Sequence, residues 1–297
     1  MTHNIFDSTE ARGRSHVVPF RTAGAGSPLF CFPGGGGSVD KFREMAAVLP
    51  EGQPVYAIDM EWLCDVEQEF TIEQLALFYL EVIRKIQNSG PYYFCGYSFG
   101  ALVAYEMAMQ LIDDGDCASL VAMLDSPNPA FLSNLSGTDA VQFRKTYLTD
   151  RLKKYCDQLL RGDMRAFVGS LLVFIVTHCG RYFMPAIKSG FRMAKKPLPQ
   201  IFHANDPTTV FLKAWRSYVP GRYAKSLVFF RSQDRGPEYD RDPSMGWGAC
   251  VMGGVQIHIV PGNHVDMMSM PSVRVIAEKL ATYLDNGLNR KESVGTL

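Results

Sequence analysis

The feature that most constrains this chain is a five-residue turn of the form G-x-S-x-G, residues 96–100, set between two stretches of different character. Residues 92–95 are aromatic or apolar and uncharged, as a buried strand requires, whereas residues 101–111 are rich in Ala, Leu and Met, which favour a helix. In such a strand-turn-helix unit the serine stands on a strained bend, with its hydroxyl above the sheet at the positive end of the helix dipole. Ser98 is therefore the predicted nucleophile.

The composition excludes several classes of protein. Of the 297 residues, 47% are apolar and 20% are charged, which are ordinary values for a globular protein. The formal net charge is zero, so there is no reason to expect that the protein binds nucleic acid. The seven cysteines are odd in number and lack C-x-x-C spacing, so we expect reduced thiols and neither a disulfide framework nor a metal site. Residues 1–16 contain no secretory signal. The most apolar segment of the chain, residues 167–176, is too short to span a bilayer. We therefore predict a cytoplasmic protein without a membrane partner.

Strands and helices are predicted to alternate through the first part of the chain. This order is typical of right-handed βαβ units, and it predicts a mostly parallel sheet with helices on both faces. Thr71 and Gln74 have the spacing of a capping box at the start of one of the helices. The predicted strands are residues 28–32, 55–59, 92–95 and 120–124, and the helices between them cover residues 41–49, 71 to about 88, and 101–111.

The alternation stops after Pro129. From residue 130 to about 216 the pattern is helical without a convincing strand, and strands then resume at residues 227–230 and 255–260. We therefore predict one α/β domain over residues 21–285 that carries a helical insertion at about 130–216. A polar tail at 1–20 and a C-terminal tail at 286–297 flank this domain, and its closing helix covers roughly residues 273–284.

A serine nucleophile needs a base, usually a histidine that a carboxylate holds in one tautomer. Of the six histidines, His264 lies in a loop just past the predicted strand 255–260, at the sheet edge where reactive groups gather. His258 lies within that strand, where an outward polar position explains it. His264 is therefore the predicted base.

Two carboxylates compete for the third place. Asp125 ends the strand that follows the nucleophile's helix, whereas Asp234 follows the strand at residues 227–230, where many α/β-hydrolases keep their acid. Both positions lie at the same edge of the predicted sheet, so the spacing alone leaves Asp125 and Asp234 open.

The four glycines at residues 34–37 follow a strand and have two interpretations. A dinucleotide-binding loop needs a third glycine where Val39 stands, and a phosphate loop needs a G-K-[S/T] that does not follow. The better interpretation is an oxyanion hole, in which a backbone N–H of this loop joins the N–H of Phe99, the residue after the nucleophile. No cofactor is therefore expected.

Four motifs, in this order along the chain, resemble the thioesterase domains of nonribosomal peptide and polyketide synthases. They are P-L-F-C-F-P-G-G-G-G at residues 28–37, G-Y-S-F-G at 96–100, L-D-S-P at 124–127, and V-P-G-N-H at 260–264 followed by Met267 and Met268. The resemblance implies an α/β-hydrolase fold with a helical lid inserted after the strand that ends at Asp125. It also implies that Asp125, and not Asp234, is the acid of a Ser-Asp-His triad, and that Gly35, with Gly34 as the neighbouring candidate, donates to the oxyanion.

The resemblance further implies a thioesterase that releases an acyl, peptidyl or polyketide chain from the phosphopantetheine arm of a carrier protein. An acyl-Ser98 intermediate would be resolved by water, which gives a free acid, or by a nucleophile of the chain itself, which gives a ring. The same triad chemistry leaves two alternatives, an esterase or lipase on oxygen esters and an acyltransferase to a separate acceptor. The chain departs from the family at Ala101, where a second glycine is common, and the resemblance does not extend to its lid.

The predicted lid has two notable stretches. Residues 181–196 hold five basic residues and no acidic one, which suits an acidic carrier protein or its phosphate, although a solvated basic face explains them as well. Apolar residues between 167 and 175 would line an acyl channel or simply pack within the lid.

Overall fold

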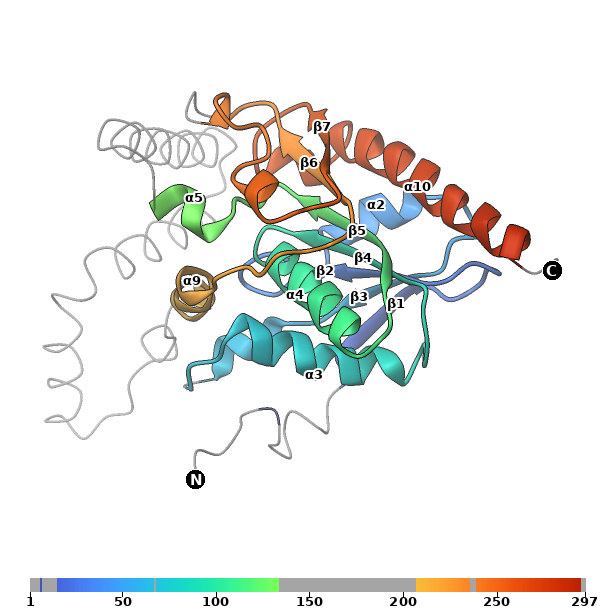
Figure 1. Cartoon of the computed structure of the whole chain (residues 1–297), viewed down its shortest axis with the longest axis horizontal. Coiled ribbons are helices and arrows are strands. Elements are labelled where there is room, and N and C mark those ends of the chain that lie inside the picture. The colour runs from blue at the N-terminus through green and yellow to red at the C-terminus, as the bar shows by residue number, and fades with distance from the viewer. Residues whose placement is uncertain (1–5, 7–14, 67, 134–206, 236–238, 295–297) are drawn as a thin grey trace, which may run out of the picture.

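The structure, a computed structural model, describes residue 6 and residues 15–66, 68–133, 207–235 and 239–294. Within these ranges the chain forms a seven-stranded sheet of order β1-β3-β2-β4-β5-β6-β7 (Figure 1). Only β1 runs antiparallel to its neighbour in this sheet, so the predicted mostly parallel sheet is confirmed. The strands are β1 (Val17–Arg21), β2 (Leu29–Phe32), β3 (Val55–Ile58), β4 (Tyr92–Tyr97), β5 (Ala118–Leu124), β6 (Leu227–Ser232) and β7 (Val255–Val260).

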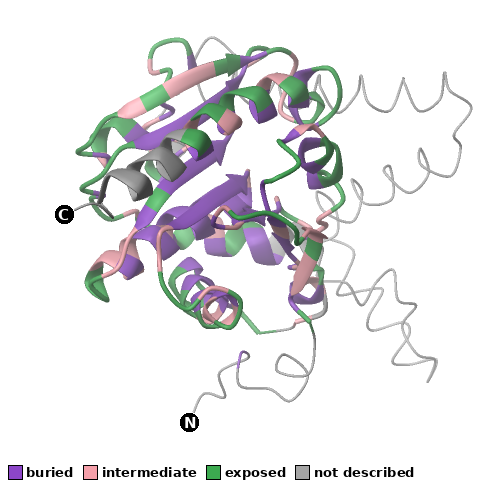
Figure 2. Ribbon diagram, turned by 90° about the vertical axis from the view of Figure 1, so that its right-hand side faces the viewer, coloured by how far each residue is buried: buried purple, intermediate pink, exposed green. Residues whose placement is uncertain are grey.

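Helices cover both faces of the sheet, as Figure 1 shows. On one face α3 and α4 pack in one apolar core, and on the other face α2 and α10 pack in a second core. The purple strands in Figure 2 lie between these two layers and are buried from both sides. The helices are α2 (Phe42–Val48), α3 (Ile72–Arg84), α4 (Phe99–Asp113), α5 (Pro129–Ser133), α9 (Pro207–Ser217) and α10 (Ser272–Val294), with 3₁₀ turns η2 (Glu61–Asp65), η4 (Trp247–Ala249) and η5 (Asp266–Met268).

Local sequence signals determine where several of these elements begin. The predicted capping box at the start of α3 is confirmed, because Gln74 N donates to Thr71 Oγ1 at 3.2 Å and Thr71 N donates to Gln74 Oε1 at 3.0 Å. A cap of this kind stabilises a helix by about 1 kcal/mol. All six residues of β4 are buried, which explains why this strand lacks charged residues.

Both predicted tails are partly incorporated in the fold. Residues Val17–Arg21 form the edge strand β1, so the predicted tail boundary at residue 20 is wrong; the strand is short, contains Pro19 and has little apolar alternation. Arg21 fixes this edge, since its Nη2 donates to the Ala46 carbonyl at 2.6 Å. At the other end α10 continues to Val294, so most of the predicted tail at 286–297 is helical.

The predicted insertion is described only at its two ends. Helix α5 begins it and α9 closes it, in agreement with the predicted helical character. Residues 134–206, which include the basic stretch at 181–196 and the apolar residues between 167 and 175, lie outside the described residues. Among the helices of the described ranges, none has the length and apolar character needed to cross a membrane.

Candidate active site

The predicted nucleophile stands on a strained turn between β4 and α4. Ser98 has φ 52° and ψ −116°, a conformation rarely found outside glycine. The two glycines of the motif, Gly96 and Gly100, lie so close to neighbouring backbone atoms that neither position has room for a side chain. A Cβ on Gly96 would lie 2.4 Å from Ala101 Cα, and a Cβ on Gly100 would lie 2.2 Å from the Phe32 carbonyl oxygen. The two glycines of the motif are therefore required by close backbone packing, as the sequence predicts.

The predicted base lies beside this serine. His264 follows β7, and its Nε2 lies 3.2 Å from Ser98 Oγ, while its Nδ1 lies 2.8 Å from Asp125 Oδ2. Tyr97 holds the histidine loop in place, because its hydroxyl donates to the His264 carbonyl at 2.7 Å and its ring stacks on the imidazole at 5.0 Å between centroids. The fold thus brings Ser98, His264 and Asp125 together from the ends of β4, β7 and β5.

The buried carboxylate that contacts the histidine is Asp125, whose side chain has no exposed surface. Ser232 donates to it twice, from its backbone N–H to Oδ1 at 2.9 Å and from Oγ to Oδ2 at 2.8 Å. Arg235 Nε donates to Oδ2 at 3.0 Å, and Nη2 of the same guanidinium also donates to Oδ2. Five donors, counting His264 Nδ1, therefore surround this carboxylate.

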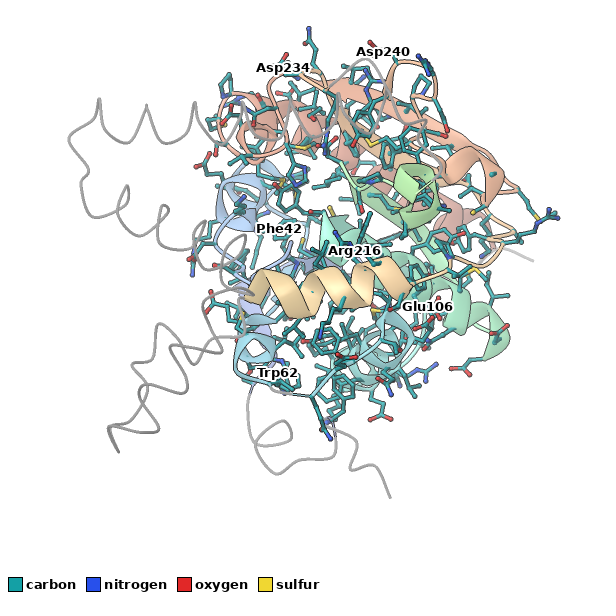
Figure 3. All side chains as sticks on the ribbon, turned by 90° about the vertical axis from the view of Figure 1, so that its left-hand side faces the viewer. Phe42, Trp62, Glu106, Arg216, Asp234 and Asp240 are labelled. Carbon is teal, nitrogen blue, oxygen red and sulfur yellow. The ribbon has the colours of Figure 1, made fainter. Side chains whose placement is uncertain are left out.

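The competing candidate, Asp234, lies elsewhere. It is exposed, and Figure 3 shows it at the periphery of the molecule. Its backbone N–H donates to the Gly262 carbonyl at 3.0 Å, so Asp234 helps to hold the loop that precedes His264. In the described part of the chain, the carboxylate that faces His264 is that of Asp125.

Charges around the pair favour an ionised acid and a neutral base. Burial raises the pKa of Asp125, but the Arg235 cation and the hydrogen bond with His264 outweigh it and hold this pKa well below its ordinary range. Burial lowers the pKa of His264, and the nearby Arg235 and Lys41 add to this effect, while Asp125 only partly offsets it. The arrangement at neutral pH is therefore a carboxylate beside a neutral imidazole, which is the state a general base requires.

Sequence reasoning missed two residues of this cluster. Ser232 is the last residue of β6, and Arg235 follows it in the next loop. The only available signal was position, since both flank Asp234 at the sheet edge where reactive groups gather. Nothing in the spacing indicates that Arg235 reaches back to the carboxylate of Asp125.

The predicted oxyanion loop lies against the nucleophile turn. A Cβ on Gly34 would lie 3.4 Å from Ser98 Cβ, and a Cβ on Gly35 would lie 3.9 Å from Phe211 Cβ of α9. The Phe211 ring also packs edge-to-face on the ring of Phe99, with 4.7 Å between centroids. The structure therefore places Gly34 beside Ser98, and both Gly35 and Phe99 lie close to Phe211.

Comparison with known proteins identifies the family. The family model of the thioesterase domain matches residues 27–283, which is most of the chain. The chain belongs to the thioesterase domain family. Within the part of this thioesterase that the structure describes, no group of three or more His, Cys, Asp and Glu side chains is placed to hold a metal ion.

Curated relatives of this thioesterase are large synthases. A non-reducing polyketide synthase of Pseudevernia furfuracea is 26% identical over 291 residues, which cover 92% of this chain and 13% of the synthase. Malpibaldin synthetase of Mortierella alpina is 25% identical over 276 residues, which cover 91% of this chain and 4% of the synthetase. The chain thus spans only a small part of the length of these relatives.

Solved structures support the fold. The NocB thioesterase domain, solved in covalent complex with a fluorophosphonate nocardicin G analogue, superposes with a TM-score of 0.60 at 19% identity, over 90% of this chain and 99% of that domain. A four-domain nonribosomal peptide synthetase superposes with a TM-score of 0.64 at 21% identity, over 90% of this chain and 20% of the synthetase. The predicted α/β-hydrolase fold and the resemblance to synthase thioesterase domains are confirmed.

Proposed function

We propose that this thioesterase releases an acyl, peptidyl or polyketide chain from the phosphopantetheine arm of a carrier protein, through an acyl-Ser98 intermediate. The observation that carries the proposal is the line of contacts from Asp125 through His264 to Ser98, found at the strand ends of a chain that belongs to the thioesterase domain family. These three residues are proposed to act as the Ser-Asp-His triad.

The proposed reaction has two halves. Ser98 Oγ attacks the thioester carbonyl while His264 Nε2 accepts its proton, and Asp125 stabilises the imidazolium that forms. The pantetheine thiol then leaves with the proton from His264, and an acyl-Ser98 ester remains. Water, or a hydroxyl or amine of the bound chain, attacks this ester with His264 again as the base, so the product is a free acid or a ring.

The developing oxyanion is proposed to accept hydrogen bonds from the backbone N–H groups of Phe99 and Gly35. Phe99 is the first residue of α4, so its N–H is not used within the helix and points along the positive end of the dipole. The position of Gly34 beside Ser98 places the glycine loop next to the nucleophile, which supports a second donor from this loop. Each donor of this kind contributes about 10²–10³ in rate.

The partner and the setting follow from the relatives. The proteins named above include a polyketide synthase, malpibaldin synthetase and a nonribosomal peptide synthetase, so we propose a carrier protein as the partner and an acyl thioester as the substrate. The proposed reaction requires no cofactor on the chain itself. A cytoplasmic location stays a prediction.

The test separates this function from oxygen ester hydrolysis and from transfer to another acceptor. Rates of thiol and alcohol release are measured with an acyl thioester of a pantetheine mimic and with its matched oxygen ester, followed by mass analysis of the products. We expect faster thiol release and a free acid or ring as product. Faster release from the oxygen ester would indicate an esterase, and a product that appears only with an added acceptor would indicate an acyltransferase.

A further inference from the structure

Arg235 occupies an unusual place in this site. It lies in the loop after β6, directly after Asp234, and its side chain is only 17% exposed. Its Nη2 lies 3.0 Å from His264 Nδ1 and 3.1 Å from the Asp125 carbonyl oxygen, and both Nε and Nη2 contact Asp125 Oδ2. One guanidinium therefore touches the acid and the base together.

This contact has a direct electrostatic consequence. The guanidinium carries only N–H donors and stays charged at any pH of interest, so it cannot accept a proton from His264. A fixed positive charge at hydrogen-bond distance disfavours a second positive charge on the imidazole. The same guanidinium also shares Asp125 Oδ2 with His264 Nδ1, which weakens the stabilisation that this carboxylate gives to an imidazolium.

We infer that Arg235 is a positioning residue that acts as a permanent counter-ion to Asp125 and keeps His264 neutral, so that the base stays available in mildly acidic solution. The inference rests on the proposed function, because it assigns Arg235 a role through the proposed triad. It adds to that function an explanation of the pH range over which the enzyme is active.

Besides Arg235 and Asp125, other charged or titratable groups lie near the imidazole, and one of them, Tyr97, stacks directly on it. Within the described residues they are Lys41 before α2, whose Nζ lies 4.9 Å from the Tyr97 ring centre, Tyr97 at the end of β4, and Asp266 in η5. Tyr239 packs on the far side of Arg235, with 5.2 Å between the guanidinium carbon and the ring centre. Two cations, Lys41 and Arg235, therefore lie near the imidazole in the described residues, and Arg235 is the one in direct contact with His264.

A second arginine provides a matched control. Arg231 in β6 is also buried and anchors the same loop, because its Nη1 donates to the Tyr239 carbonyl at 2.9 Å and its Nη2 to Asp240 Oδ1 at 2.8 Å. These bonds hold Tyr239 and Asp240 and include neither Asp125 nor His264. Removing this charge therefore disturbs the anchoring of the loop without removing the cation beside the imidazole.

The experiment measures kcat/KM against pH with an acyl thioester of a pantetheine mimic, for wild type, Arg235→Gln, Arg235→Lys and Arg231→Gln. The acidic limb of this profile reports the pKa of the base in the free enzyme. Loss of the cation raises that pKa, so the limb of Arg235→Gln moves to higher pH, by about one unit. Arg235→Lys keeps the charge and leaves the limb near that of wild type, and Arg231→Gln lowers stability without moving it.

Two results would overturn the inference. Arg235→Gln could lower the rate equally at every pH, or Arg235→Lys could move the limb as far as Arg235→Gln does; in either case Arg235 is a structural anchor only. A nitrogen-15 NMR titration of the histidine side chains, with His264 assigned through His264→Gln, measures the same pKa without turnover. Absence of thioester turnover in wild type would count against the proposed function, whereas an unchanged His264 titration in Arg235→Gln would count against the inference alone.

Discussion

The two ends of the proposed triad are built in different ways. At the nucleophile end, Ser98 is held by its sequence neighbours Gly96 and Gly100 and by the close approach of the Phe32 carbonyl. At the acid end, Asp125 is held by Ser232 and Arg235, which are 107 and 110 residues away in the chain, and it contacts His264, 139 residues away. The first end is determined by local backbone geometry, and the second by charges that the fold brings together.

The difference predicts different kinds of failure. A substitution at the nucleophile end either removes the reacting atom or causes steric overlap, so its effect does not depend on pH. A substitution at the acid end changes which buried charges are paired, so it affects activity, pH dependence and stability together. Substitutions at four positions, Ser98, Asp125, Gly100 and Ser232, test this contrast, with others as controls.

The largest effect is expected at the reacting atom. Ser98→Ala removes the nucleophile and should lower kcat for thioester cleavage by about 10⁴–10⁶. The melting temperature should hardly change, because the substitution removes only one oxygen from a half-buried side chain. A variant with a rate near that of wild type would contradict the assignment of Ser98.

The next effect is expected at the acid. Asp125→Asn should lower kcat by about 10⁴, because the amide no longer holds the required tautomer of His264. It should also destabilise the fold by about 3 kcal/mol, because Arg235 keeps an unpaired buried charge.

Two variants sharpen this test of the acid. The double variant Asp125→Asn/Arg235→Gln should recover stability, measured by urea unfolding, without recovering activity. Asp234→Asn should change kcat by no more than about twofold, because Asp234 is exposed. Similar losses in the two Asp→Asn single variants would remove the distinction between Asp125 and Asp234.

A purely steric effect is expected at the nucleophile turn. Gly100→Ala would place its methyl group 2.2 Å from the Phe32 carbonyl oxygen and 2.4 Å from that of Pro33, so the end of β2 must move. We expect a loss of about 2–3 kcal/mol in the free energy of unfolding. The control is Gly52→Ala, where a Cβ meets nothing within 4 Å, and it should be nearly neutral. Equal stability of the two variants would show that the turn is not tightly packed.

The smallest effect is expected at Ser232. Ser232→Ala removes one of the donors to Asp125 Oδ2, while the backbone N–H of residue 232 still donates to Oδ1. The loss of one hydrogen bond to a charged group corresponds to about 1.5 kcal/mol, or roughly a tenfold lower kcat/KM if it is felt fully in the transition state. A loss as large as that of Asp125→Asn would show that Ser232 itself takes part in the reaction.

The contrast between the two ends also explains what could be predicted from the sequence. The nucleophile turn, the capping box at Thr71 and the alternation of strands and helices depend on neighbouring residues, and these predictions were confirmed. The edge strand β1 was missed because a five-residue strand at an edge needs little apolar patterning and pairs with a strand far along the chain.

The arrangement around the acid could be recognised only from the three-dimensional structure. From spacing, Asp125 and Asp234 were equivalent, and only the resemblance to synthase thioesterases favoured Asp125 before the structure placed it against His264. Arg235 could not be predicted at all, because its role depends on the direction in which one long side chain leaves a loop. A sequence pattern records residue types and spacing, but it does not record that direction.

The proposed role of Ser98 as the nucleophile is best tested by intact-mass and peptide mass analysis of the protein after brief mixing with a short acyl thioester of a pantetheine mimic. We expect an adduct of one acyl group, located on Ser98 and absent from Ser98→Ala. Thiol release by wild type with no adduct on Ser98, or with an adduct on another residue, would contradict this role.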